Sequence, residues 1–212
     1  MKQKWSWLSM TVVAGVAASS APAQIAPGRS GSSTMSSFGG DEVWRTLDAF
    51  GSCYALQNWP QAFELLATTP GSREEAVVYR RLFRSHNQSC LGEGTVRLSV
   101  APDMVRGAIA EGLYRRGYAV PSNLIVAAPP PGAEIRTFSE AARCYATTHR
   151  EQVRTLITET RPGSRQEMEA INALSGEFST CLPPRVRNRT FFSTEIRFRL
   201  AEALLRLPPT AR

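Results

Sequence analysis

Hydrophobic residues recur every three or four positions in several stretches of the chain, a spacing that predicts amphipathic helices. Proline or glycine residues separate these stretches, as is typical of the turns between helices. One segment differs, because residues 95–100 alternate between apolar and polar and predict a short strand or an extended loop. The residues of the predicted helix faces are Val43, Leu47, Phe50 and Tyr54; Val78, Tyr79, Leu82 and Phe83; Val105, Ala108, Ile109, Gly112 and Leu113; and Ile196, Leu200, Ala203, Leu204 and Leu207.

The two halves of the chain share a sequence signature. Cys53-Tyr54-Ala55 precedes Cys90-Leu91, and the same letters return as Cys144-Tyr145-Ala146 before Cys181-Leu182. A Pro-Gly-Ser-Arg turn and a helix of the pattern R-x-x-[IL]-A-E-x-L-x-R also occur twice, with the copies 91 or 92 residues apart. Matches at one offset predict an internal duplication.

The predicted fold class is all-α or nearly so, with two tandem units of about four helices and one disulfide per unit. The units cover residues 41–116 and 135–208, and a proline-rich linker at residues 117–134 joins them. Residues 24–40 are rich in glycine and serine and predict a flexible leader.

The N-terminus has the features of a secretory signal peptide. Lys2 and Lys4 precede an apolar run, and Ala21-Pro22-Ala23 provides small residues for cleavage after Ala23. These features predict a signal peptide at residues 1–23 and a periplasmic or secreted protein. An uncleaved N-terminal anchor is the alternative.

The four cysteines allow three disulfide pairings. Equal spacing in the two halves favours Cys53–Cys90 and Cys144–Cys181, since each unit would then contain its own bridge. An oxidising compartment outside the cytoplasm preserves such bonds. A metal site formed by the cysteines with His86 and His149 is a weaker alternative because no C-x-x-C motif is present, and we predict no metal and no cofactor.

Two glutamates in equivalent helices are candidates for a structural role. Glu111 and Glu202 each stand four residues before an arginine, Arg115 and Arg206. The sequence allows either a local ion pair on each helix or a contact across to Arg73 or Arg165 of a neighbouring helix. Two capping boxes are also predicted, in which Glu75 and Glu167 reach back to the serines three residues before them, Ser72 and Ser164. Gly107 and Gly112 are predicted to allow close helix packing.

Arginines supply nearly all the positive charge, and only Lys2 and Lys4 are lysines among the 25 basic residues. The formal net charge of +7 is compatible with weak attraction to anionic surfaces. The densest basic cluster is a candidate anion-binding patch, formed by Arg185, Arg187, Arg189, Arg197 and Arg199. Nucleic acid is not an expected partner, because the sequence lacks a recognisable DNA-binding element.

The sequence contains no G-x-S-x-G motif and no phosphate-binding loop. We therefore expect an exported, non-catalytic helical protein that contacts another protein of the bacterial cell envelope. The second hypothesis is a binder of lipid or lipopolysaccharide phosphate at an anionic membrane surface, through the arginine patch. The third is an enzyme with an unrecognised site, which a cleft lined by Glu111, Glu202 and His149 would support.

Overall fold

The computed structural model describes residues 25–26, 40–83, 90, 100–130, 133–182 and 191–209. Within these residues the chain is mostly helical with almost no strand, as predicted. The signal-peptide prediction and most of the predicted strand at residues 95–100 lie outside the described residues. The helices are α1 (Gly40–Gln57), α2 (Trp59–Ala67), α3 (Arg73–Leu82), α4 (Pro102–Arg115), α5 (Phe138–Thr148), α6 (Arg150–Glu159), α7 (Arg165–Cys181) and α8 (Ser193–Arg206), and the two-residue strands are β1 (Ile25–Ala26) and β2 (Phe191–Phe192).

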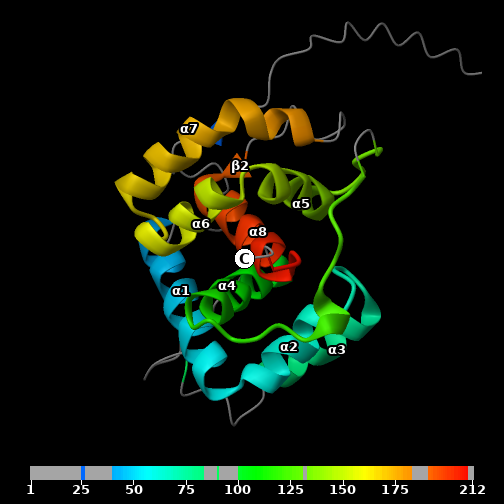
Figure 1. Ribbon diagram of the computed structural model, residues 1–212. Coiled ribbons are helices and arrows are strands. Elements are labelled where there is room, and N and C mark those ends of the chain that lie inside the picture. The colour runs from blue at the N-terminus through cyan, green and yellow to red at the C-terminus, as the bar shows by residue number, and fades with distance from the viewer. Residues whose placement is uncertain are drawn as a thin grey trace, which may run out of the picture.

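Helices α4 and α8 lie side by side in the centre of the molecule (Figure 1). Helix α1 packs mainly on α4, and α5 packs mainly on α8. The N-terminal half (α1–α4) and the C-terminal half (α5–α8) each have a hydrophobic cluster. Phe198 and Leu205 of α8 belong to the cluster of the N-terminal half, so the central helix connects the two cores.

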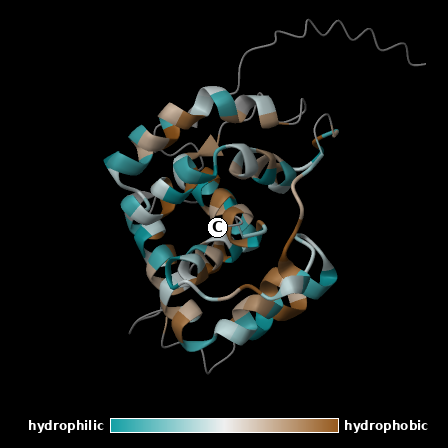
Figure 2. Ribbon diagram, viewed as in Figure 1, coloured by the Kyte–Doolittle hydropathy of each residue, from teal (hydrophilic) through white to brown (hydrophobic). Residues whose placement is uncertain are grey.

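The central helices are buried more completely than the sequence pattern predicts. Every residue from Met104 to Leu113 in α4 is buried, including Arg106 and Glu111. The predicted apolar stripe is buried, but the polar face lies inside the protein as well, because the two halves enclose the helix from different sides. Both hydrophilic and hydrophobic residues accordingly occur along the helices, including the central ones (Figure 2).

Glycines bring the backbones of three helices close together. A methyl group at Gly112 would lie 2.5 Å from the carbonyl oxygen of Gly51 on α1. A methyl group at Gly107 would lie 2.7 Å from the carbonyl oxygen of Phe198 on α8. The prediction that Gly107 and Gly112 are close-packing positions is confirmed.

The predicted capping boxes differ from the observed caps. Ser72 accepts a hydrogen bond from the Glu75 amide at 3.0 Å, as predicted, but the Glu75 carboxylate accepts from the amide of Gly71. Glu167 likewise accepts from Gly163. In the first turn the Ser72 amide already donates to the carbonyl of Thr69, so the glutamate takes the preceding amide. The reciprocal capping box occurs instead at the start of α5, between Thr137 and Glu140.

Both disulfides have the predicted pairing. Cys53 is bonded to Cys90 and Cys144 to Cys181, with Cα atoms 5.5 and 5.9 Å apart. The disulfide partners in each half are separated by 37 residues, as the equal spacing suggested. Because the cysteine sulfurs are used in disulfides, the alternative of a cysteine metal site is wrong.

Two segments outside the helices are attached to the helical core. β1 pairs in parallel with β2, which places Ile25 opposite Phe191, so this part of the leader forms regular structure. In the predicted linker Leu124 is buried, and the amide of Val126 donates to the carbonyl of Arg206 at 2.8 Å. No helix in the described part of the chain combines the length and the apolar character needed to cross a membrane.

Candidate functional site

Arg106, near the middle of the molecule, is completely buried and forms five hydrogen bonds. Its Nε donates to Glu202 of α8 at 2.8 Å. Its terminal nitrogens donate to the carbonyls of Leu65 and Leu66 at 2.8 and 2.7 Å, at the end of α2. The same guanidinium also contacts Glu75. Arg106 thus joins α4 to α2, to α3 and to the other half of the molecule.

Arg197 makes a corresponding set of contacts from α8. Its guanidinium donates through two nitrogens to the Glu111 carboxylate of α4, at 2.9 and 2.8 Å. It also donates to the carbonyls of Leu156 and Ile157 at the end of α6. The two arginines are 91 residues apart in the chain, and so are the two glutamates that they contact.

Both alternatives for Glu111 and Glu202 occur, since each glutamate pairs within its helix and with a neighbouring helix, but the cross-helix partners named from the sequence are wrong. The partners are Arg197 and Arg106, and neither Arg73 nor Arg165 takes part in these ion pairs. The pairs with Arg115 and Arg206 on the same helix are present as well. Burial raises the pKa of Glu111, and the guanidinium of Arg197 opposes this shift. Each buried charge is therefore compensated by an opposite charge, and the network is part of the packing of α4 against α8.

The predicted anion-binding patch is not a continuous surface. Arg197 is wholly buried in the network, and the Arg199 side chain is only 12% exposed and paired with Asp103. Arg197 faces the interior because α8 is a central helix. Arg185, Arg187 and Arg189 lie outside the described residues.

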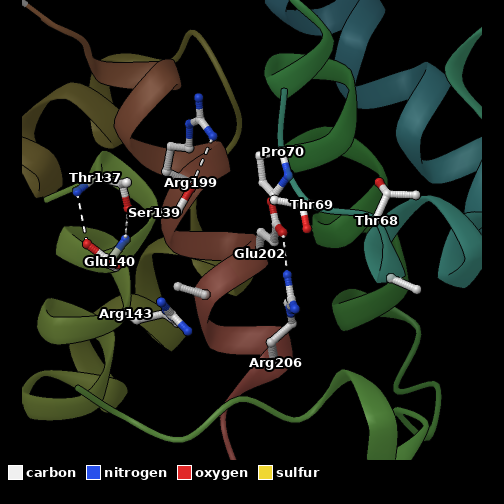
Figure 3. A pocket seen from close by; sticks show the side chains of 12 residues that line it. Thr68, Thr69, Pro70, Thr137, Ser139, Glu140, Arg143, Arg199, Glu202 and Arg206 are labelled. Atoms are coloured by element: carbon white, nitrogen blue, oxygen red, sulfur yellow. Dashed lines mark hydrogen bonds and ion pairs between the residues drawn. The ribbon is translucent and has the colours of Figure 1, made fainter. Parts of the chain in front are cut away.

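A pocket of about 350 Å³ opens where the two halves meet (Figure 3). One wall is the start of α5, another is α8, and the third is the turn between α2 and α3. Arginines and glutamates line it together with small apolar residues, so it is both charged and partly apolar. The lining residues are Ala67, Thr68, Thr69, Pro70, Thr137, Ser139, Glu140, Arg143, Arg199, Glu202, Ala203 and Arg206.

The charged groups of this pocket differ in how far they are neutralised. Arg206 donates to Glu202 at 3.0 Å, and Arg199 is paired with Asp103 and lies 3.4 Å from the Ser139 hydroxyl. Arg143 extends from α5 toward α8 (Figure 3). Its guanidinium has no hydrogen bond or ion pair with any described residue, and its positive charge attracts the carboxylate of Glu140, three residues before it on α5. Arg143 is the pocket residue best placed to bind an external anion.

Sequence reasoning missed Arg143 and Ser139 because neither belongs to a motif. A signal was present in the comparison of the halves. At the position 91 residues before Arg143 the chain has Ser52, and at the position 91 residues before Arg199 it has Ala108. Two of the three arginines that line the pocket, Arg143 and Arg199, thus stand at positions where the two halves differ, whereas Arg206 corresponds to Arg115.

A second hollow of about 520 Å³ lies at another contact between the halves, where α1 meets the turn between α6 and α7. Its lining is Arg45, Asp48, Arg161, Pro162, Gly163 and Ser164. Asp48 accepts a hydrogen bond from Arg115 at 3.3 Å, so this acid is already neutralised.

The residues that would have supported an enzyme are dispersed. Of Glu111, Glu202 and His149, only Glu202 lines the pocket between α5, α8 and the α2–α3 turn. His149 stacks on Tyr145, and its Nδ1 lies 3.2 Å from Glu177. Among the described residues no group of three or more histidine, cysteine, aspartate or glutamate side chains is placed to hold a metal ion.

The two tyrosines of the repeated signature belong to the core and not to a groove. Tyr54 and Tyr145 are fully buried, and burial raises the pKa of each to about 12. Tyr54 stacks on Phe50, and Tyr145 contacts Phe178 edge to face.

No protein-family model, curated protein or solved structure matches the chain.

Proposed function

We propose that this chain is an exported, non-catalytic helical protein that binds another envelope protein through the pocket between α5, α8 and the α2–α3 turn. The observation that carries the proposal is Arg143, which lies in a pocket lined by both halves and has no hydrogen bond or ion pair to any residue that the structure describes. By contrast, the two completely buried arginines, Arg106 and Arg197, already have carboxylate partners. A binding function needs an accessible group of this kind, whereas the buried pairs serve the fold.

An internal duplication explains where this pocket formed. The sequence offset of 91 or 92 residues relates the signatures of the two halves, and the buried contacts follow the same offset. Arg106 with Glu202 corresponds to Arg197 with Glu111, and Leu65 and Leu66 correspond to Leu156 and Ile157. On this proposal the shared residues maintain the fold, and positions that differ between the copies, such as Arg143 and Ser52, provide the function.

The signal-peptide features of residues 1–23 and the two disulfides support the proposed export. The disulfides are compatible with an extracellular or periplasmic location, since such bonds persist in oxidising compartments. The proposed mature chain begins at Gln24, one residue before β1.

Binding to an anionic membrane surface is less well supported than binding to a protein. Two of the five arginines proposed for it, Arg197 and Arg199, are buried or nearly so and have acidic partners. A flat phosphate-bearing surface cannot reach a buried guanidinium.

Site-specific photo-crosslinking in cells tests the proposed function. A photoreactive amino acid at Thr69, an exposed residue on the pocket rim, should crosslink to one envelope protein. The same group at Glu151, exposed on α6 and outside this pocket, is the control and should not give that product. Identical products from both positions, or no product from Thr69, would contradict the proposal.

A further inference from the structure

We propose that this pocket is a carboxylate-binding site that holds the carboxylate of a peptide ligand against Arg143. The inference rests on the proposed binding function and adds the chemical class of the ligand.

Arg143 supplies the positive charge for such a site. A guanidinium presents a planar fork of N–H donors that matches the two oxygens of a carboxylate. Arg143 is partly buried, so water screens its charge less than it would on an open surface. The N–H groups of this guanidinium are available to a ligand, because no described residue accepts a hydrogen bond from them.

Other donors of the pocket complete the site. Ser139, one helical turn before Arg143, presents a hydroxyl on the same wall. The Nε of Arg199, another lining residue, is buried and has no hydrogen-bond partner among the described residues. This nitrogen is shielded from solvent, so the accessible donors of the site are the Arg143 guanidinium and the Ser139 hydroxyl.

The acidic residues of the lining favour a singly charged ligand over a phosphate. Glu140 accepts hydrogen bonds from the amides of Arg136 and Thr137, which lower the pKa of its carboxyl, so it stays ionised at neutral pH. Glu202 lies on the opposite wall in its ion pairs with Arg106 and Arg206. A phosphate monoester carries up to two negative charges at pH 7 and would meet stronger repulsion from these two carboxylates than a single carboxylate would.

The remaining lining suits a small peptide residue next to the carboxylate. Ala67, Pro70 and Ala203 give the pocket an apolar surface, and Thr68 and Thr69 add hydroxyls. The volume of about 350 Å³ is at the lower end of the range of ligand pockets. The pocket is therefore large enough for one or two residues of an extended chain that ends in, or carries, a carboxylate.

Titration of the purified chain, starting at Gln24, with small probes tests the site by NMR at constant ionic strength. The probes are N-acetyl-alanine, which has a C-terminal carboxylate; N-acetyl-glutamine amide, which has none; N-acetyl-glutamate amide, which has a side-chain carboxylate; and inorganic phosphate. Saturable shifts of amides in α5 and of the amides of Thr68 and Thr69 are expected with the two carboxylate probes. The relative affinities of these two probes distinguish a chain terminus from an acidic side chain as the ligand.

Variants at Arg143 separate a specific site from general charge attraction. R143A should weaken carboxylate binding about tenfold, as expected for the loss of a charged hydrogen-bonding partner, and R143K should have an intermediate effect. R154A removes the same charge from an exposed pair with Glu151 on α6 and should leave the affinity unchanged. Circular dichroism and the melting temperature check that each variant is folded.

Three results would overturn the carboxylate site. They are equal affinity of R143A and the wild type, equal shifts with the carboxylate and amide probes, and tighter binding of phosphate than of either carboxylate. Carboxylate binding that depends on Arg143 without a crosslinked protein would leave the site standing and reject the proposed partner. A specific crosslink at Thr69 without carboxylate binding would support the proposed protein partner and reject the carboxylate site.

Discussion

Arg106 and Arg197 are the two largest completely buried side chains in the part of the chain that the structure describes. Removing a guanidinium from water costs several kcal/mol, so a buried arginine is tolerated only where its donors find acceptors and its charge finds a counter-ion. Both arginines meet these conditions by combining one carboxylate from the opposite half with backbone carbonyls near the end of a helix of their own half. Helix C-termini carry partial negative charge, which adds to the attraction.

Removing one carboxylate from this network should therefore be costly. We expect Glu111→Gln to lower the free energy of unfolding by about 3 kcal/mol, because Arg197 would remain buried without a full counter-charge. Urea denaturation followed by circular dichroism measures the change. Glu151→Gln removes the same charge from the exposed Arg154 pair and should change stability by less than about 1 kcal/mol. Similar effects of the two variants would show that the buried pair contributes little.

Glu167 should make stability depend on pH. It is wholly buried, its Oε1 has no hydrogen-bond partner among the described residues, and burial raises its pKa from 4.5 to about 7. Arg197, the Gly163 amide and the Thr194 hydroxyl oppose this shift, and the negative charge of Glu111 adds to it. The folded state thus binds the proton more tightly than the unfolded state, and the contribution of Glu167 to stability should fall as pH rises from about 4.5 to about 7.

NMR titration of the Glu167 carboxyl carbon checks this prediction directly, and denaturation at pH 5 and pH 8 checks its effect on stability. Glu167→Gln cannot ionise and should remove this part of the pH dependence. A Glu167 carboxyl that titrates near its ordinary value of 4.5 would contradict the prediction.

At the scale of the elements, periodicity predicted the helices and their apolar faces because burial of one face leaves a repeat of three or four residues. It could not predict that α4 and α8 are buried on all sides, since that depends on the packing of distant segments. The same limit explains the mistaken partners of Glu111 and Glu202. A glutamate on a helix signals an ion pair, but which arginine crosses to it depends on how the two central helices meet.

Glycines decide how closely the elements approach, and two of them give a matched test. In Gly112→Ala the new methyl group would lie 2.5 Å from a backbone oxygen of α1, so we expect a loss of about 2 to 3 kcal/mol. Gly176 is also helical, but a methyl group there meets no atom within 4 Å. Gly176→Ala should instead stabilise the protein by about 0.5 to 1 kcal/mol, because alanine favours the helical state more than glycine does.

Thermal and urea denaturation of both variants measure the two effects. The free energy of unfolding should fall in Gly112→Ala and rise in Gly176→Ala, although each substitution adds the same methyl group. A stabilising Gly112→Ala would show that α1 and α4 separate easily, which would weaken the interpretation of these glycines as close-packing positions.

At the scale of the whole molecule, the spacing of the cysteines predicted both disulfides, because the equal separation in the two halves favoured one bridge within each half. The sequence did not predict how the halves join. The halves share the central helices, since residues of α8 lie in both hydrophobic clusters and each half supplies a carboxylate to the arginine of the other. The pocket with Arg143 could not be predicted for the same reason, since its walls come from segments far apart in the chain.

This arrangement predicts that the halves unfold together, and the tryptophans allow a test. In a chain that starts at Gln24 the tryptophans are Trp44 and Trp59, both in the N-terminal half, so their fluorescence reports on that half. Replacing the disulfide of the other half, with Cys144→Ser and Cys181→Ser together, should cost about 4 kcal/mol in the chain-entropy model. If the central helices couple the halves, the urea midpoint seen by tryptophan fluorescence should fall as far as the midpoint seen by circular dichroism. An unchanged fluorescence midpoint beside a lowered or two-step circular dichroism transition would show that the halves unfold independently, in spite of the buried pairs between them.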